Sequence, residues 1–280
     1  MSFTTRPLAD EVRFGRMSTG ELRAAFLLDG LFRPGSLDLC HWDAERTIVG
    51  SACPGAVPLV LEAPPELRAS YFLERRELGV VNVGGAGVVT VDGARHALGH
   101  RETLYVGRGS KQVTFATDGS AAGPGPRFWL VSHPAHAPWP VRRVTEAEAE
   151  TVRIGDASHA SERVLRRYIH ARGARSCQLV MGVTDLVAGS VWNTMPPHTH
   201  ARRTEIYLYF DLEPGGCAFH FMGPAGETRH LVVRNLEAVL SPSWSMHFAA
   251  GSGRYAFVWS MGGENQEFED MQGVGLEELK

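Results

Sequence analysis

The sequence predicts an all-β protein made of two copies of one β unit, and three observations support this prediction. First, 31 glycines and 16 prolines separate short apolar and aromatic segments. Second, the residue composition changes once, near the middle of the chain. Third, segments on the two sides of that change resemble one another. A length of 280 residues is enough for two domains, each with a substantial core.

The predicted strands are short runs rich in Val, Leu, Phe, Tyr and Trp, each bounded by residues that favour turns. In the first half they include VVTVDG, TLYVG, QVTFAT and RFWLVS. In the second half they include CQLVMGVTDL, EIYLYFDL, CAFHFMG and YAFVWSM. Strands this short, with turn signals this frequent, are typical of β-sandwiches and barrels.

Two short helices are expected beside the sheets. The segment Thr19–Gly30 has a Thr cap at its start and a Gly stop at its end. The segment Ser161–His170 has a Ser cap and an apolar face formed by Val164, Leu165, Tyr168 and Ile169.

The segment His133–Glu150 has the composition of a linker, because Pro, small residues and then charges replace the strand pattern. We therefore expect a domain boundary near residue 140, with domains at 1–140 and 141–280. The linker contains His133 and His136 without an acidic residue at metal-binding spacing, so both are expected to be solvated.

A repeat crosses this boundary. The stretch LERRELGVVNVGG (Leu73–Gly85) resembles HARRTEIYLYFDL (His200–Leu212). Further along, TLYVGRGSKQVTF (Thr103–Phe115) resembles AVLSPSWSMHFAA (Ala238–Ala250). The two halves are therefore expected to share one architecture.

Composition narrows the classes of partner. With 28 Lys and Arg against 31 Asp and Glu, the formal charge is -3, and no basic block is long enough to follow a phosphate backbone. We therefore expect no nucleic-acid partner. The four cysteines lack CxxC spacing and are expected to be reduced thiols. No signal peptide or membrane segment is recognisable, so a cytoplasmic protein without a membrane partner is expected.

One cluster of residue types points to a metal. The stretch MPPHTHARRTEIYLYF places His198, His200 and Glu205 in the spacing HxHxxxxE, and His247 follows in SPSWSMH. Residues two apart on a strand face the same side, so His198 and His200 can enter one cavity, and a turn can return Glu205 on the next strand. Three imidazoles and one carboxylate suit a divalent ion such as zinc or iron.

These residues resemble the motifs of the cupin family, whose first motif is HxHxxxxE and whose second is PxGxxH. Here the second motif runs from Pro242 to His247, with Trp244 at the place of the usual Gly and without the Asn that often follows the His. The resemblance implies a bicupin, in which the domain at 141–280 binds the metal.

The first half keeps the pattern without its ligands. Ser70 and Phe72 stand at the two histidine places, Glu77 stands opposite Glu205, and Gly107–Gln112 stands opposite the second motif. The resemblance therefore implies that the domain at 1–140 is cupin-like and lacks the metal ligands.

A narrower resemblance covers nearly the whole chain. Five segments are similar to segments of the bacterial 5-keto-4-deoxyuronate isomerase family: SYFLERRELGVVNVGGAGVVTVDG, WNTMPPHTHARRTEIYLYF, ETRHLVVRN, SPSWSMH and MGGENQEFEDM. The resemblance implies one Zn²⁺ per subunit, held by the two His of HTH, the Glu after RRT and the His of SPSWSMH. It also implies a homohexamer in pectin and uronate degradation.

The implied substrate is a small anionic keto-sugar acid. The reaction converts 5-dehydro-4-deoxy-D-glucuronate to 3-deoxy-D-glycero-2,5-hexodiulosonate, an aldose–ketose isomerisation. It needs removal of a proton next to a carbonyl, an enediolate intermediate and return of the proton at the adjacent carbon. A Lewis-acid metal would stabilise the enediolate charge.

Candidates for the remaining roles follow from this chemistry. Period-two alternation turns Tyr207 toward the cavity as a proton donor, and His220 in CAFHFMG is a second candidate. A buried Tyr or His with a satisfied hydrogen bond is the competing interpretation. The substrate carboxylate calls for a guanidinium, for which the chain offers Arg202, Arg203 and Arg229. A surface or interface salt bridge is the alternative for each arginine.

Two other functions fit the same residues. An iron-dependent cupin dioxygenase can use the same three histidines and glutamate to activate oxygen. A non-catalytic sugar-binding cupin would bind the ligand without turnover. The fold alone does not separate these functions, because cupins host many activities.

Overall fold

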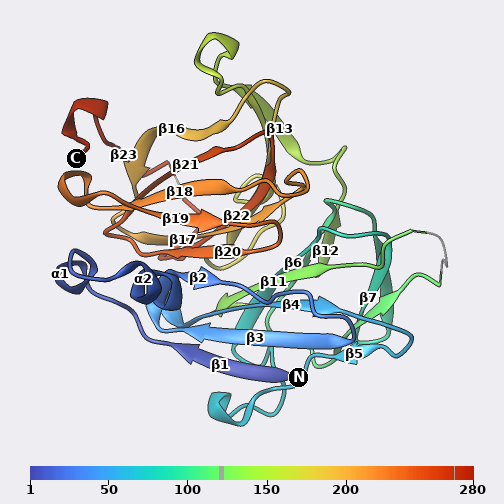
Figure 1. The fold of residues 1–280 in the computed structure, drawn as a ribbon. Helices are drawn as coiled ribbons and strands as arrows, with labels where there is room; N and C mark the ends of the chain where they lie inside the picture. The colour runs from blue at the N-terminus through green and yellow to red at the C-terminus, as the bar shows by residue number, and fades with distance from the viewer. Residues whose placement is uncertain (120–122, 268) are drawn as a thin grey trace. The chain divides into compact units, whose positions relative to one another are not determined.

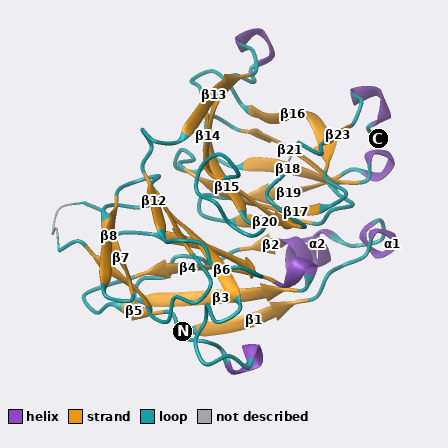
Figure 2. Cartoon of the chain, turned by 180° about the vertical axis from the view of Figure 1, so that it is seen from behind, coloured by secondary structure: helices purple, strands orange, loops and turns teal. Residues whose placement is uncertain are grey.

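The computed structural model describes residues 1–119, 123–267 and 269–280. Strands are the main regular element and helices are confined to short segments, as Figures 1 and 2 show. The chain divides into two compact units. Unit 1 comprises Met1–Arg6, Gly30–Ala149 and Tyr168–Val180, and unit 2 comprises Pro7–Asp29, Glu150–Arg167 and Met181–Lys280. Each unit therefore includes a segment from the other side of residue 140.

Unit 1 contains two sheets. The seven-stranded sheet has the order β1-β3-β4-β11-β6-β9-β12, and the four-stranded sheet has the order β5-β10-β7-β8. Neighbouring strands are antiparallel except for β1 and β3, which run parallel. The bounds are β1 Ser2–Arg6, β3 Ser36–Trp42, β4 Thr47–Cys53, β5 Leu59–Val60, β6 Arg76–Asn82, β7 Gly87–Val91, β8 Ala94–Leu98, β9 Thr103–Val106, β10 Val113–Thr117, β11 Phe128–Pro134 and β12 Arg142–Val144. Two 3-10 turns, η1 Ala44–Arg46 and η2 Pro65–Leu67, complete the unit.

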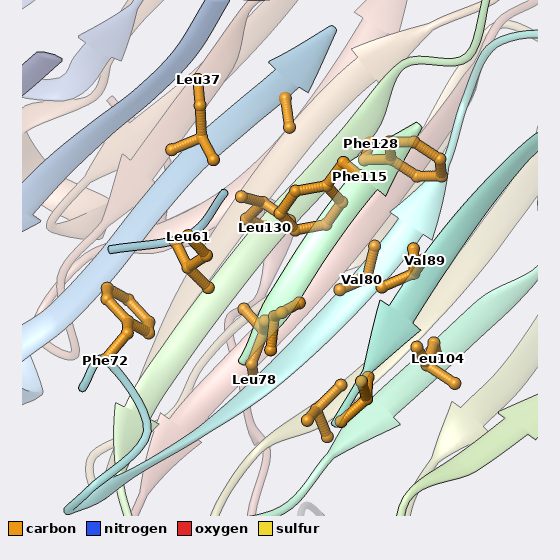
Figure 3. Close-up of a cluster of buried hydrophobic side chains, with 14 of the residues drawn as sticks. Leu37, Leu61, Phe72, Leu78, Val80, Val89, Leu104, Phe115, Phe128 and Leu130 are labelled. Atoms are coloured by element: carbon orange, nitrogen blue, oxygen red, sulfur yellow. The ribbon is translucent and has the colours of Figure 1, made fainter. Parts of the chain in front are cut away.

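Apolar side chains fill the interior of unit 1. Figure 3 shows part of this core, including Leu78 and Val80 of β6 and Phe115 of β10. Phe72, at the place of the second histidine of the motif, is buried in the same cluster with 3% of its surface exposed. Each buried aliphatic or aromatic side chain contributes roughly 1.5–3 kcal/mol. In the described part of unit 1, this position therefore belongs to the apolar core.

The sequence comparison placed Glu77 opposite Glu205, and the structure corrects this by one residue. Leu78, the third residue of β6, lies in the core, so the alternation along the strand turns Glu77 to the opposite face. There its carboxylate accepts hydrogen bonds from the Tyr105 hydroxyl at 2.8 Å and from the backbone N–H groups of Cys177, Gln178 and Leu179 at 2.7 to 3.0 Å. Glu77 thus holds the segment Tyr168–Val180 to unit 1.

Unit 2 repeats the arrangement. Its seven-stranded sheet has the order β13-β14-β15-β22-β17-β20-β2, and its five-stranded sheet has the order β19-β18-β21-β16-β23. The bounds are β2 Leu27–Leu28, β13 Glu150–Ile154, β14 Arg163–Ile169, β15 Val180–Leu186, β16 Trp192–Thr199, β17 Arg203–Phe210, β18 Ala218–Gly223, β19 Arg229–Val233, β20 Ala238–Ser241, β21 Met246–Gly251, β22 Ala256–Gly263 and β23 Gln272–Gly273. Three 3-10 turns are η3 Ala157–His159, η4 Ala225–Glu227 and η5 Leu276–Glu278.

The strand order supports the repeat seen in the sequence. The run β3-β4-β11-β6-β9 in unit 1 corresponds in position to β14-β15-β22-β17-β20 in unit 2. The repeat segments fall on equivalent strands, since β6 matches β17 and β9 matches β20. Five neighbouring strands of the larger sheet therefore follow the same order in both units.

One helix prediction is confirmed in part and one is wrong. Helix α2 spans Thr19–Phe26, and its cap is Ser18, which exchanges hydrogen bonds with Glu21 in a capping box. It is preceded by the short helix α1, Glu11–Phe14. The segment predicted as a second helix, Ser161–His170, instead forms strand β14, which pairs with β13. Pairing within the sheet outweighs a weak local helix signal here.

His133 also departs from expectation. It was predicted to be solvated in a linker, but it lies on β11 with none of its surface exposed, and its Nδ1 atom is 3.3 Å from the Thr47 hydroxyl. Burial, together with the nearby Arg76 charge, lowers the pKa of His133 to about 3. The strand pattern therefore continues into the segment taken for a linker.

None of the helices in the described part of the chain is long and apolar enough to cross a membrane.

Candidate metal centre

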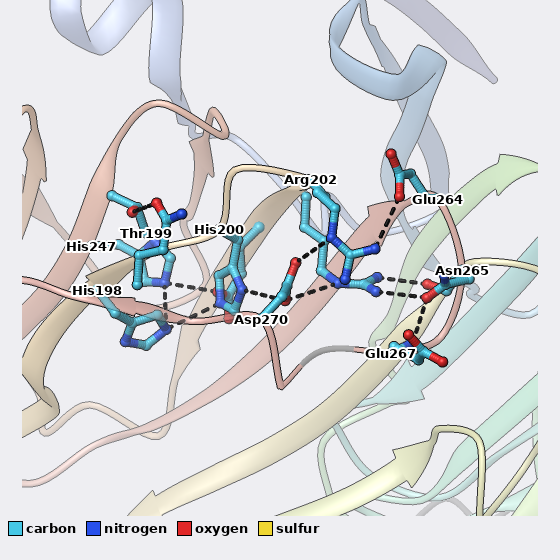
Figure 4. A network of polar contacts seen from close by, with 12 residues as sticks. His198, Thr199, His200, Arg202, His247, Glu264, Asn265, Glu267 and Asp270 are labelled. Atoms are coloured by element: carbon cyan, nitrogen blue, oxygen red, sulfur yellow. Dashed lines mark hydrogen bonds and ion pairs between the residues drawn. The ribbon is translucent and has the colours of Figure 1, made fainter.

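Three strands of unit 2 bring the predicted ligands together. His198 lies on β16, Glu205 on β17 and His247 on β21, and His200 follows the end of β16. One ligand atom from each of these four side chains lies within 4.8 Å of the others. All four side chains have less than a tenth of their surface exposed except His198, which is half-buried. Figure 4 shows the three imidazoles facing one another.

The distances between these atoms fit a shared ion. The Nε2 atom of His198 lies 3.1 Å from Nε2 of His200 and 3.3 Å from Nε2 of His247. A Glu205 carboxylate oxygen, Oε2, lies 2.8 Å from Nε2 of His247 and 3.6 Å from Nε2 of His200. Ligand atoms about 2.0–2.1 Å from a common ion lie about 3.3 Å apart in a tetrahedron. The measured separations bracket that value.

The hydrogen bonds on the far side of the rings explain this convergence. Nδ1 of His200 lies 3.2 Å from Oδ1 of Asp270, and Nδ1 of His247 lies 3.5 Å from the Ser241 hydroxyl. A ring that donates through Nδ1 presents a lone pair at Nε2. Lone pairs and a carboxylate oxygen directed at one point repel each other unless a cation lies between them. This donor set therefore fits a divalent metal.

The charge states suit a metal as well. Burial alone would raise the pKa of Glu205, but the neighbouring imidazoles, His247 foremost, hold it at about 2. Burial and the nearby His247 lower the pKa of His198 to about 3. Near neutral pH the site thus presents an ionised carboxylate and a neutral imidazole, the forms that bind metals.

Asp270 is a partner of the site that the sequence did not reveal. Its carboxylate joins His200 to two arginines, at 3.3 Å from Nε of Arg202 and 3.5 Å from Nε of Arg203. Figure 4 shows this chain of contacts. Asp270 lies 70 residues after His200 in the sequence, and no spacing pattern links the two.

The three arginines proposed for substrate binding have other contacts. Arg202 pairs with Glu264 at 3.0 Å, and Arg203 donates to the backbone carbonyl of Asn265 at 2.6 Å. Arg229 donates to the Met17 carbonyl at 2.7 Å. None of these arginines is among the residues lining the cavity beside the metal ligands.

That cavity has a volume of about 380 Å³. Its wall includes three of the candidate metal ligands, His198, His200 and Glu205. The rest of the wall is largely apolar, with a few polar and charged side chains. The other lining residues are Ile154, Arg163, Leu165, Arg167, Thr184, Thr194, Met195, Pro196, Pro197, Tyr207, Phe257, Trp259, Met261, Met271 and Gly273. A volume of this size is typical of a small-molecule site.

Of the two proposed proton-transfer residues, Tyr207 lines the cavity and His220 does not. Tyr207 lines the cavity together with Thr194 and Glu205. Burial, with the Glu205 charge, raises the pKa of Tyr207 well above its usual value, so the hydroxyl keeps its proton. His220 is fully buried outside the cavity lining, where Nδ1 lies 2.7 Å from the Tyr209 hydroxyl. Tyr207 is thus positioned to meet a ligand, and His220 lies behind it with 5.3 Å between the ring centroids.

Trp244, which replaces the usual Gly of the second motif, has a structural role. Its ring packs edge-on against Phe14 of α1 at 5.3 Å and Phe26 of α2 at 6.3 Å, measured between centroids. The N-terminal segment of unit 2 is therefore packed against the turn that precedes His247.

Comparison with known proteins identifies the family and the enzyme class of this chain. The model of the KduI/IolB family matches residues 38–273. The chain is 48% identical to a 4-deoxy-L-threo-5-hexosulose-uronate ketol-isomerase of Bacillus pumilus, over 95% of each chain. It is 47% identical to the enzyme of that name from Opitutus terrae over 95% of each chain, and 45% identical to that from Dickeya dadantii over 95% of each chain. These relatives confirm the predicted enzyme class, a ketol-isomerase, which is an intramolecular oxidoreductase.

Solved structures agree on the fold. An IolB-like protein from Salmonella typhimurium superposes with a TM-score of 0.65 at 15% identity, covering 81% of this chain and 86% of that chain. Oxalate decarboxylase from Lactobacillus farciminis superposes with a TM-score of 0.57 at 9% identity, covering 81% and 79% of the two chains. The predicted all-β cupin fold is thereby confirmed. Together, the family match and the close relatives show that this chain belongs to the KduI/IolB family.

Proposed function

We propose that this protein is a zinc-dependent isomerase that converts 5-dehydro-4-deoxy-D-glucuronate to 3-deoxy-D-glycero-2,5-hexodiulosonate. The observation that supports it best is the set of four converging ligand atoms, three of which belong to residues that line a cavity of about 380 Å³. The names of the relatives supply the substrate class, since each is a ketol-isomerase of a hexosulose-uronate.

Four side chains would hold the ion: His198, His200, Glu205 and His247. Zinc bound there acts as a Lewis acid that stabilises negative charge on substrate oxygens without redox chemistry of its own. Asp270 orients the His200 ring through the hydrogen bond at Nδ1.

Tyr207 is the proposed proton-transfer residue. An aldose–ketose isomerisation moves one proton between adjacent carbons and requires a proton donor for the carbonyl oxygen that becomes a hydroxyl. Tyr207 lines the same cavity as Glu205, and its raised pKa keeps the hydroxyl protonated. It can therefore donate its proton to a substrate oxygen and recover it later in the cycle.

The apolar part of the wall would help a bound substrate to displace water. Leu165, Phe257 and Met261 line the same cavity as the ligands. Polar and charged interactions are stronger in a site from which water is removed. Hydrogen bonds from Tyr207 and contacts to the metal would therefore become stronger where the substrate displaces water.

A role in pectin and uronate degradation, assembly into a hexamer and a cytoplasmic location are further parts of this proposal. They rest on the family resemblance and stay predictions. The strand edges at β13 and β19 offer backbone groups for contacts between subunits.

Proton NMR in heavy water tests the proposed reaction. Protein stripped with a chelator and protein reloaded with zinc are each incubated with 5-dehydro-4-deoxy-D-glucuronate. We expect the signal of the hydrated aldehyde to disappear only with the zinc-loaded protein, and solvent deuterium to enter the product. An unchanged spectrum with folded, zinc-loaded protein would refute the proposal, and consumption of oxygen in place of isomerisation would favour the dioxygenase.

A further inference from the structure

A buried guanidinium on the cavity wall has no role in the metal centre. Arg163 is the first residue of β14, and 8% of its surface is exposed. Along this strand Arg163, Leu165 and Arg167 all line the cavity, as the alternation of a strand requires. Because this segment was expected to be a helix, the sequence did not single Arg163 out.

The charge of Arg163 is not balanced by a carboxylate. Its guanidinium donates to two backbone carbonyls, that of Ser161 at 2.8 Å and that of Met195 at 3.5 Å. Within residues 1–119, 123–267 and 269–280, no Asp or Glu forms an ion pair with it. Three other arginines of unit 2 each pair with an acid: Arg153 with Glu162, Arg166 with Asp185 and Arg167 with Glu150.

An unbalanced buried cation is costly. Removing a charge from water costs several kcal/mol unless a counter-charge and hydrogen bonds replace the lost hydration. Two carbonyls occupy only part of a guanidinium that has five N–H donors. A ligand with an anionic group would compensate the charge that the protein itself leaves uncompensated.

A second polar group in the cavity also lacks a partner. Thr184 lies on β15, which neighbours β14 in the sheet, and its side chain is fully buried in the cavity wall. Its hydroxyl has no hydrogen-bond partner within the described part of the chain. Buried hydroxyls are normally hydrogen-bonded, so an unsatisfied one facing a cavity indicates a polar ligand atom.

We propose that Arg163 and Thr184 form a carboxylate-binding subsite, which holds the acid end of a sugar acid whose carbonyl end faces His198, His200, Glu205 and His247. This inference rests on the proposed function for the identity of the substrate, and it replaces the arginines expected from the sequence. A guanidinium can bind a carboxylate through two parallel hydrogen bonds, which fixes direction as well as position. The subsite therefore orients the chain of the substrate along the cavity.

The neighbouring arginine is a weaker candidate. Arg167 also lines the cavity, but its guanidinium donates to Glu150 at 3.2 Å. That carboxylate already supplies the counter-charge. Arg163 is thus the residue that distinguishes an acid from a neutral sugar.

Binding measurements test the subsite separately from turnover. Isothermal titration calorimetry with the zinc-loaded protein compares D-glucuronate with D-glucose, a neutral molecule of nearly the same shape. We expect the wild type to bind the acid more tightly than the neutral sugar. Arg163→Gln should lower the affinity for D-glucuronate at least about tenfold and leave the affinity for D-glucose unchanged. Thr184→Val keeps the shape of the side chain and removes the hydroxyl. It should lower the affinity for D-glucuronate by roughly threefold to tenfold.

Two further variants make the result decisive. Arg163→Lys keeps the positive charge but lacks the planar guanidinium, so it should bind D-glucuronate with intermediate affinity. This variant also tests the subsite if Arg163→Gln does not fold. Arg153→Gln removes an exposed guanidinium of the same unit and should match the wild type. Urea unfolding and zinc content are measured for every variant.

The outcomes separate the two proposals. A wild type that binds D-glucuronate no better than D-glucose, or folded Arg163 variants that keep the wild-type preference, would overturn the subsite. A wild type that prefers the acid through Arg163 yet leaves 5-dehydro-4-deoxy-D-glucuronate unchanged would refute the isomerase and leave the subsite standing. If both hold, Arg163→Gln should raise KM for the substrate more than it lowers kcat.

Discussion

Asp270 Oδ1 lies 3.2 Å from Nδ1 of His200, which places a carboxylate directly behind one of the four candidate metal ligands. Burial raises the pKa of Asp270, but the hydrogen bond with His200 and the charge of Arg203 outweigh this effect and lower the pKa overall. A carboxylate in this place fixes the ring orientation of His200 and increases the basicity of its Nε2 atom.

Replacing this carboxylate should weaken metal binding. We expect Asp270→Asn to lower the affinity for zinc by about 10–100-fold while the fold is retained. Competition with a chromophoric chelator measures the affinity. Glu264→Gln is the matched control, because Glu264 is exposed and contacts Arg202 without touching a ligand. Equal zinc affinity in Asp270→Asn and the wild type would contradict the role given to Asp270.

Removal of the Tyr207 hydroxyl should affect turnover more than metal binding. Tyr207→Phe deletes the hydroxyl that lies beside Glu205 in the cavity wall. We expect kcat to fall by about 10²–10⁴-fold, the usual contribution of a general acid or base, with zinc still bound. The rate is measured by NMR, and the zinc content by atomic absorption.

Tyr209→Phe provides the comparison for Tyr207→Phe. Tyr209 follows two residues later on β17, and its hydroxyl contacts His220 outside the cavity lining. It should lose about 1 kcal/mol of stability and keep most of its activity. If both variants lose activity equally, proton transfer does not depend on Tyr207 in particular.

The stability of unit 1 should depend on pH through His133. Its pKa is lowered to about 3 in the folded protein, against about 6.5 in an unfolded chain. Between these values only the unfolded chain binds the proton, so stability falls as the pH is lowered from about 6.5 toward 3, by up to about 1.4 kcal/mol per pH unit.

Urea denaturation at pH 7 and at pH 4.5 measures this effect. His133→Gln should lose less stability between the two pH values than the wild type does, because its side chain does not titrate. His136→Gln, which replaces an exposed histidine, should lose as much as the wild type. A wild type and a His133→Gln variant with the same loss would show that His133 is not the group responsible.

The N-terminal segment should contribute to the stability of unit 2. Phe14 is fully buried against Trp244 and Phe26. Phe14→Ala should therefore lower the free energy of unfolding by about 3–5 kcal/mol. Val12→Ala, at a side chain with 74% of its surface exposed, should have little effect. Thermal unfolding followed by circular dichroism gives both values, and a small loss for Phe14→Ala would mean that the aromatic cluster is dispensable.

The metal ligands could be predicted from the sequence because their spacing is local. His198 on β16, His200 just after the end of β16 and Glu205 on β17 lie within eight residues, so two successive strands are enough to bring them together. His247 comes from β21, which pairs with β16 and sets His247 directly opposite His198. The repeat of the two halves was also visible in the sequence, although the register of Glu77 was wrong by one residue.

The remaining parts of the site depend on tertiary contacts. Asp270 reaches His200 across 70 residues of sequence. Arg163 and Thr184 meet the cavity only because β14 and β15 are neighbouring strands of one sheet. The apolar residues around Arg163 are spaced as in a helix as well as in a strand, and only pairing with β13 decides between the two.

The most direct test of the account is a zinc titration in which bound metal and initial isomerisation rate are measured in the same samples. Metal-free protein receives increasing zinc, and each sample is assayed with 5-dehydro-4-deoxy-D-glucuronate. We predict that the rate rises in proportion to bound zinc and levels off at one ion per chain, and that His247→Ala neither binds this ion nor turns over the substrate. Full activity in the metal-free protein, or no activity at one zinc per chain, would contradict the account.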